Sequence, residues 1–239
     1  MSGWFASSTP LIIAHRGANF DAPENTITAF ALAAEQQADG IELDVQLSAD
    51  GVPVIIHDST VNRTTNGSGA VSKLTRDQLE ALDAGDGRPI PTLDQLFETF
   101  GPTLLYNVEL KSGLWPDPNL AAAVAERIEG HHLEEHVLVS SFNLLAIRQA
   151  RRTLSSRTPV AHLRLSGLSS FKHQLVKAAG DNPHHKLVNG RYMAWAARQK
   201  LLVNVWTVDD PAEAQRLANL GVTSIITNQP GSIRSSLSI

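Results

Sequence analysis

Short apolar runs alternate with helical patterns along most of this chain. Between the runs, apolar residues of 25–37 share one helical face, namely Ile27, Phe30, Ala31 and Ala34. Eight runs are typical of strands, near residues 11–14, 40–46, 103–110, 136–141, 158–164, 185–189, 201–207 and 222–227. Eight strands separated by helices within 239 residues favour one closed (β/α)8 barrel over an open doubly wound sheet.

Two further helices are marked by their first residues. Thr92 followed by Gln95 forms a capping box, and Gly101 is a typical helix end. Asp210 followed by Pro211 opens another helix in the same manner. No linker divides the chain, so we expect a single domain over residues 1–239.

One additional strand, 52–57, follows 45–51 too closely for a crossover helix and predicts a hairpin. If Asp50 and Gly51 form a two-residue turn, His57 lies opposite Asp44. The next segment, 59–89, is rich in Thr, Asn, Gly and Asp and is too long for an ordinary connection. We expect it to be a small insertion over the barrel mouth.

Carboxylates occupy strands that should carry none. Glu42 and Asp44 project from the same face of one apolar run, and Glu109 shares a face with Lys111 in another. Ionised carboxylates removed from water cost several kcal/mol each unless they are paired or bind a metal. An all-carboxylate site suits Mg²⁺ or Ca²⁺. The alternative is a set of ion pairs of these carboxylates with Arg16 and Lys111, without a metal.

Histidines and anion-binding residues follow the same strands. His15 and Arg16 end the first strand, and His57 comes to that end through the hairpin. Arg16 offers a rigid fork and Lys111 a point charge to an anion. With three carboxylates, two cationic side chains and a divalent cation, a phosphodiester monoanion brings the formal charge to zero. Two histidines could then divide the proton transfers as general acid and general base.

These residues fall in motifs that resemble the glycerophosphodiester phosphodiesterases. The motifs are His15-Arg16-Gly17, Pro23-Glu24-Asn25-Thr26, Glu42-Leu43-Asp44, the run from Asp50 to Asp58, Asn107-Val108-Glu109-Leu110-Lys111 and Val205-Trp206-Thr207-Val208. The resemblance runs from about residue 11 to 230. It implies a TIM-like barrel with a small insertion after the second catalytic histidine, a divalent cation, and hydrolysis of glycerophosphodiesters to glycerol 3-phosphate and an alcohol.

The resemblance also implies roles for individual residues. By position, His15 and His57 are the acid–base pair and the carboxylates bind metal, whereas the phosphate and pocket residues are Arg16, Lys111, Phe142 and Trp206. Aromatic residues in strands often only pack, so the last two could equally belong to the core. The last strand departs from the family pattern, with Thr223, Ser224 and Asn228 in place of Asp, Gly and Asp.

The composition of the chain indicates its cellular compartment and argues against some classes of binding partner. The net charge of −4 without a basic block argues against nucleic acid and anionic membranes as partners. The chain has no cysteine, no apolar run of membrane-spanning length and no signal-like start, so we expect a cytoplasmic protein. Its oligomeric state, its headgroup preference and the choice between Mg²⁺ and Ca²⁺ stay open.

Three other functions compete with this one. A lysophospholipase D or sphingomyelinase D activity would need an apolar groove or an interfacial segment, which the sequence does not reveal. A catalytically inactive binding protein is disfavoured because every catalytic position is filled. A carboxylate-metal sugar isomerase fits the acidic residues but does not account for two strand-end histidines with Arg16 and Lys111. The residues do not assign acid and base between the histidines.

Overall fold

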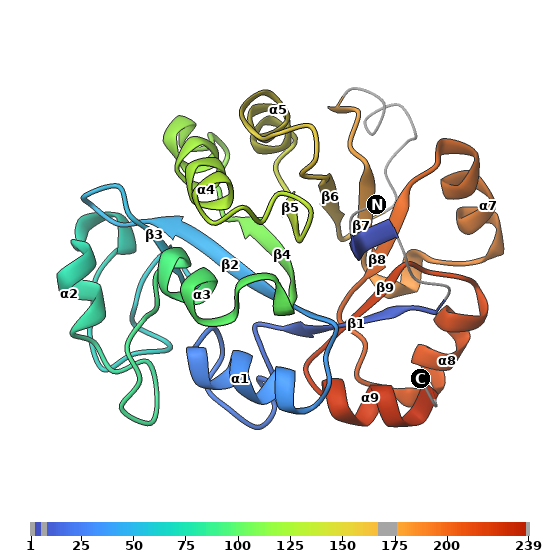
Figure 1. Ribbon diagram of the computed structural model, residues 1–239, viewed down its shortest axis with the longest axis horizontal. Helices are drawn as coiled ribbons and strands as arrows, with labels where there is room; N and C mark the ends of the chain where they lie inside the picture. Colours follow the sequence, from blue (N-terminus) through green and yellow to red (C-terminus); the bar gives the residue numbers. More distant parts are fainter. Residues whose placement is uncertain (1–2, 6–8, 167–175, 238–239) are drawn as a thin grey trace.

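Parallel strands form a closed barrel in the computed structural model, which describes residues 3–5, 9–166 and 176–237 (Figure 1). β1 pairs with both β2 and β9, which closes the ring. In these described residues the barrel has eight parallel strands: β1 Leu11–His15, β2 Gly40–Leu47, β4 Leu105–Leu110, β5 Val137–Ser141, β6 Val160–Arg164, β7 Gly180–Pro183, β8 Leu202–Val205 and β9 Ser224–Thr227. The predicted fold class is confirmed.

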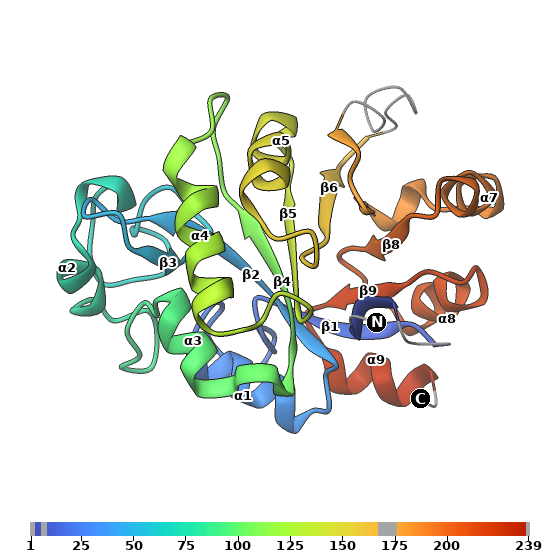
Figure 2. The same ribbon diagram turned by 45° about the horizontal axis from the view of Figure 1, so that its top comes forward.

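Helices surround the barrel on its outside (Figures 1 and 2). Thr92 and Gln95 form the predicted capping box, and Gly101 is the C-cap at φ 50°. Asp210 caps its helix by accepting from the Ala212 N–H. The main helices are α1 Ile27–Glu35, α3 Leu93–Phe100, α4 Pro118–Gly130, α5 Leu144–Thr153, α7 Gly190–Gln199, α8 Pro211–Asn219 and α9 Pro230–Leu237.

Among the helices of the described ranges, not one combines the length and the apolar character needed to cross a membrane.

Strand alternation decides which side chains enter the barrel. In β2, Ile41, Leu43 and Val45 belong to the apolar core between barrel and helices, and in β4 Tyr106 and Val108 join the same core. Because successive side chains of a strand point to opposite faces, the residues between them point into the barrel. This alternation directs the carboxylates of both strands inward.

The hairpin differs by one residue from the predicted register. β3, Pro53–Ile55, pairs with β2 so that Ile55 lies opposite Val45, whereas the prediction placed His57 opposite Asp44. The loop has three residues rather than two, because Gly51 adopts φ 79° and its N–H donates to Ser48 O at 3.0 Å. The Ile56 N–H donates to Asp44 O at 2.9 Å, so His57 still follows at that end of β2.

The strand predicted at 185–189 is wrong. The sixth barrel strand is β7, Gly180–Pro183, whereas His185–Leu187 forms a single 3-10 turn. The β7 sequence, Gly-Asp-Asn-Pro, has no apolar run, and its polar side chains contact neighbouring strands: Asp181 pairs with Arg164, and Asn182 Oδ1 accepts from the Asn204 amide. The apolar Val188 packs instead in an apolar cluster with Ala196 of α7 and Leu217 of α8.

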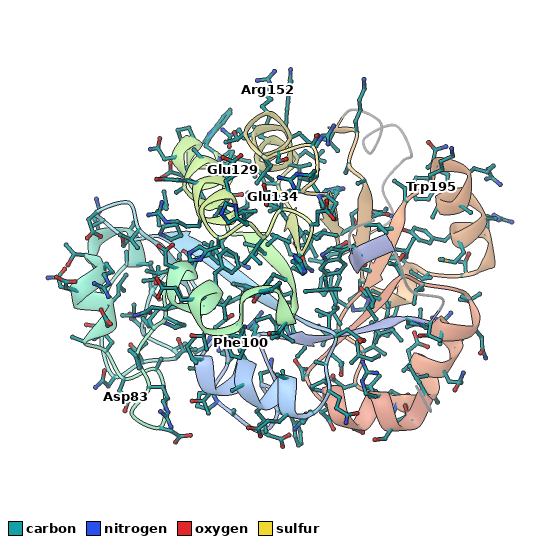
Figure 3. All side chains as sticks on the ribbon, viewed as in Figure 1. Asp83, Phe100, Glu129, Glu134, Arg152 and Trp195 are labelled. Carbon is teal, nitrogen blue, oxygen red and sulfur yellow. The ribbon has the colours of Figure 1, made fainter. Side chains whose placement is uncertain are left out.

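The segment 59–89 carries a small apolar cluster of its own. Val61, Val71, Leu79 and Ala84 pack with Val54 and Ile56 of the hairpin and with Ile90. Its helix α2, Arg76–Glu80, begins at a capping box of Thr75 and Gln78. Figures 1 and 2 show α2 beside β3, outside the ring of helices that covers the barrel, and Figure 3 labels Asp83 in the same segment.

Candidate active site

A cavity of about 200 Å³ lies at the carboxyl ends of the barrel strands. Of the nine residues singled out from the sequence, eight line it: His15, Arg16, Glu42, His57, Glu109, Lys111, Phe142 and Trp206. The ninth, Asp44, is 1% exposed. Asn107, Leu163, Leu165 and Ile226 complete the lining. The fold therefore brings the predicted chemistry into one place.

The three inward carboxylates form a compact cluster. Oxygens of Glu42, Asp44 and Glu109 lie within 4.8 Å of one another, because β2 and β4 are neighbours and pair Asp44 with Glu109. Burial, reinforced by the charge of Asp44, raises the pKa of Glu109 to about 7. Burial and the same neighbour raise the pKa of Glu42 well above its usual range. The cluster thus holds more negative charge than its surroundings neutralise.

Asp44 keeps its charge for a different reason. Burial alone would raise its pKa, but Lys111 and Arg16 outweigh that effect and hold the pKa below its usual range. Lys111 Nζ lies 3.4 Å from Asp44 Oδ1, yet this buried oxygen accepts no hydrogen bond. A buried, ionised oxygen without a donor, between two other carboxylates, is the arrangement that a hard divalent cation satisfies. The residues present fit such a cation.

Arg16 is held against this cluster by the backbone. It adopts φ 54°, and its N–H donates to Glu42 O at 2.8 Å. Its guanidinium donates to Glu24 Oε1 at 3.0 Å and lies 3.1 Å from Asp44 Oδ2, which also accepts from the Asn25 amide at 2.9 Å. The sequence motif contained Glu24 and Asn25 but did not reveal these supporting contacts.

His15 is oriented from the last strand of the barrel. The Asn228 amide donates to Asp209 Oδ2 at 2.6 Å, which turns its carbonyl oxygen toward His15. That oxygen accepts from His15 Nδ1–H at 2.7 Å, so Nε2 is left without a proton, 3.9 Å from Glu42. Burial and the charge of Arg16 lower the pKa of His15. Sequence analysis missed Asp209 and named Asn228 only as a departure from the family pattern.

His57 is oriented by its own neighbour in the chain. Its Nδ1–H donates to Asp58 Oδ1 at 2.6 Å, and Arg63 donates to Asp58 Oδ2 at 2.6 Å. The hydrogen bond from Arg63 is the main cause that lowers the pKa of Asp58. Arg63 also donates to Glu24 at 2.8 Å and thereby ties the segment 59–89 to the site. Sequence analysis did not single out Arg63, because its second partner, Glu24, lies 39 positions away in the chain.

The opposite side of the cavity is apolar. Phe142 and Trp206 meet edge to face with ring centroids 5.5 Å apart. The indole of Trp206 is fixed by donating to Asn182 O at 2.7 Å, whereas Phe142 is 41% exposed. Together with Leu163 and Leu165 they give the cavity one charged wall and one apolar wall.

Proteins of known sequence and structure are similar to this chain, in sequence and in fold, over nearly its whole length. The glycerophosphoryl diester phosphodiesterase family model matches residues 15–232. A glycerophosphodiester phosphodiesterase of Caldanaerobacter subterraneus is 37% identical, with 92% of this chain and 94% of the relative covered. One from Bacillus subtilis is 30% identical, with 92% of this chain and 84% of the relative covered.

Solved structures agree with this likeness. An Oleispira antarctica phosphodiesterase in complex with the product sn-glycerol-3-phosphate has a TM-score of 0.90 and 29% identity, with 97% of this chain and 98% of the other covered. The Agrobacterium tumefaciens glycerophosphodiester phosphodiesterase has a TM-score of 0.83 and 29% identity, with 95% and 99% covered. With the family match spanning the histidines and the carboxylates alike, this chain belongs to the glycerophosphoryl diester phosphodiesterase family.

Proposed function

We propose that this enzyme hydrolyses glycerophosphodiesters to sn-glycerol 3-phosphate and an alcohol, with His15 and His57 as the acid–base pair. The observation that carries the proposal is one cavity lined by both oriented histidines, Arg16, Lys111, Glu42 and Glu109, with Asp44 buried beside the two glutamates. The related Oleispira phosphodiesterase binds sn-glycerol-3-phosphate, which supports the same product here.

Glu42, Asp44 and Glu109 would hold one divalent cation, Mg²⁺ or Ca²⁺, because all their donors are carboxylate oxygens. Such an ion would supply Lewis-acid stabilisation of a negatively charged phosphoryl oxygen. Arg16 and Lys111 orient the phosphate, and the wall of Phe142 and Trp206 borders the carbon chain of the substrate. Of the two histidines, one accepts a proton from the attacking water or glycerol hydroxyl group, and the other donates a proton to the leaving oxygen.

The absence of cysteine supports a reducing compartment such as the cytoplasm, and we propose that compartment.

The direct test is release of glycerol 3-phosphate from glycerophosphocholine by the purified protein. We expect turnover that EDTA abolishes and that added Mg²⁺ or Ca²⁺ restores, because three crowded carboxylates need the cation. Comparing the two ions at equal concentration identifies the one that the enzyme uses. Full activity in the presence of EDTA would disprove the metal dependence, and absence of turnover with either ion would disprove the function.

The phosphate-binding role of Arg16 predicts sensitivity to a conservative change. Arg16→Lys keeps the charge but removes the planar fork, so we expect KM for glycerophosphocholine to rise about tenfold or more. Lys73→Arg, at an exposed site in the insertion, is the matched control and should leave KM unchanged. If Arg16→Lys has the kinetics of the parent, Arg16 only pairs with Glu24 and Asp44.

We propose that the segment 59–89 shapes access to the cavity, because its Arg63 contacts both Asp58 and Glu24. Replacing the segment with a short Gly-Ser loop should raise KM more for glycerophosphodiesters than for a small chromogenic phosphodiester. Equal effects on both substrates would indicate that the segment supports the fold alone.

A further inference from the structure

Large hydrophobic side chains are exposed on only one side of the described molecule. Within residues 3–5, 9–166 and 176–237, all six of them lie on the loops or first helical turns that follow barrel strands, at the end where the cavity opens. They are Phe20, Leu114, Trp115, Phe142, Leu145 and Leu165, with exposed fractions from 41% to 83%. Single exposed hydrophobic residues are ordinary, but their restriction to the catalytic side is not.

Five of these residues form one continuous surface, which we call the apolar rim: Leu114, Trp115, Phe142, Leu145 and Leu165. The loops after β4 and β5 are joined, because the Asn143 amide donates to Gly113 O at 2.8 Å and to Leu114 O at 3.2 Å. Trp115 and Leu145 border one hollow of about 390 Å³, and Phe142 and Leu165 border the catalytic cavity. The apolar rim therefore extends from the cavity to that hollow.

Arginines lie directly behind the apolar rim. Helix α5 carries Arg148, Arg151 and Arg152 and has no acidic residue. All three are exposed and form no ion pair with any residue that the structure describes, and Arg148 and Arg152 line the same hollow as Trp115. Figure 3 shows Arg152 projecting outward from α5. At a rise of 1.5 Å per residue, Arg148 and Arg152 lie about 4 to 10 Å behind Leu145 along the helix.

We propose that the apolar rim docks the catalytic side of the enzyme on an anionic lipid bilayer. Tryptophan and leucine side chains at the tip can enter the boundary between headgroups and acyl chains. Arginines one to two turns behind them then reach the level of the lipid phosphates, where each cationic side chain adds attraction. In this orientation the cavity faces the lipid surface.

The charge distribution favours a bilayer over a second copy of the chain. A two-fold contact through the apolar rim would bring two sets of three unpaired arginines together, and like charges at close range oppose such a contact. The proposal departs from the expectation drawn from the net charge of −4, because that total does not describe the local charge of α5.

Vesicle sedimentation tests this proposal without any turnover, so its outcome is separate from that of the proposed function. We expect the protein to bind vesicles of phosphatidylcholine with about 30 mol% phosphatidylserine more tightly than pure phosphatidylcholine vesicles. Arg148→Gln with Arg152→Gln should weaken binding to the anionic vesicles about fivefold for each arginine lost. Arg198→Gln with Lys200→Gln, at the far end of α7, removes the same charge and should change nothing.

Leu114→Ser with Trp115→Ser should remove binding to anionic vesicles, and Leu145→Ser is a milder second variant. Because these side chains lie outside the catalytic cavity, activity on a soluble phosphodiester and the melting temperature should stay at parental values, which verifies folding. The emission of Trp115 should shift to shorter wavelength with vesicles, and Trp115→Phe should lose that shift. Three results would each overturn the proposal. They are equal affinity for both vesicle types, an equal loss of vesicle binding in the α7 control, and self-association that the serine variant abolishes while the parent protein does not bind vesicles.

Discussion

Alanine substitution of either His15 or His57 is expected to lower kcat/KM for glycerophosphocholine by about 10²- to 10⁴-fold. The two imidazoles are separately oriented, His15 by Asn228 and His57 by Asp58, which suits two different proton transfers. A substrate with a p-nitrophenolate leaving group needs little protonation as the bond breaks. That substrate should therefore rescue one alanine variant and not the other, and the rescued variant lacks the proton donor.

Parallel kinetics on the two substrates provide the measurement. His132→Asn is a suitable control, because His132 is exposed at φ 57°, a conformation that asparagine tolerates. The double variant should be less than additive if the histidines act on one reaction coordinate. Two variants that both keep parental kcat/KM would contradict the acid–base assignment, and two that are rescued equally would contradict the division of roles.

Asp44→Asn is expected to cost at least about 10³-fold in kcat, since it removes the ionised member of the carboxylate cluster. Glu42→Gln and Glu109→Gln should lose activity in the same direction. Asp77→Asn, at an 88% exposed carboxylate in α2, is the matched control. Calorimetric titration with Mg²⁺ and Ca²⁺ should show weakened cation binding in parallel with the loss of kcat. Tight cation binding by all three cluster variants would place the ion elsewhere.

The same carboxylates predict how the metal-free protein responds to pH. In the folded state the pKa of Glu109 is raised from 4.5 to about 7, so the folded chain binds its proton more tightly than the unfolded chain. The free energy of unfolding must then fall as pH rises through this window. Thermal unfolding in EDTA should show a melting temperature that decreases from about pH 5 to about pH 7, and Glu109→Gln should reduce that decrease. An unchanged pH dependence in the variant would contradict the pKa of Glu109.

The barrel and most of the site could be predicted because both rest on local pattern. Alternation along β2 and β4 fixes which residues face inward, and a carboxylate there stands out against apolar neighbours. The sixth barrel strand, β7, was misplaced because its polar residues find their partners only on other strands. Asn182, for example, accepts from Asn204, 22 positions away in the chain.

The supporting contacts were missed for a related reason. Arg63 and Asp209 are ordinary surface-type residues in the sequence, and their contacts with Glu24 and Asn228 join positions 39 and 19 residues apart in the chain. The predicted hairpin register is wrong because of one glycine. Gly51 adopts a left-handed conformation, and the loop is one residue longer than predicted. The sequence pattern therefore predicts the candidate catalytic and metal-binding residues. The residues that orient them can be identified only from the closed fold.

The contact between His15 and Asn228 spans 213 positions and joins the first strand of the barrel to the last. The carboxylates, Arg16 and Lys111 all lie within the first 111 residues, on or next to β1, β2 and β4. Asn228, the partner of His15, follows β9 directly and is placed by the pairing of β9 with β1. The orientation of His15 therefore depends on closure of the barrel, whereas the carboxylate cluster is assembled by the neighbouring strands β2 and β4 alone.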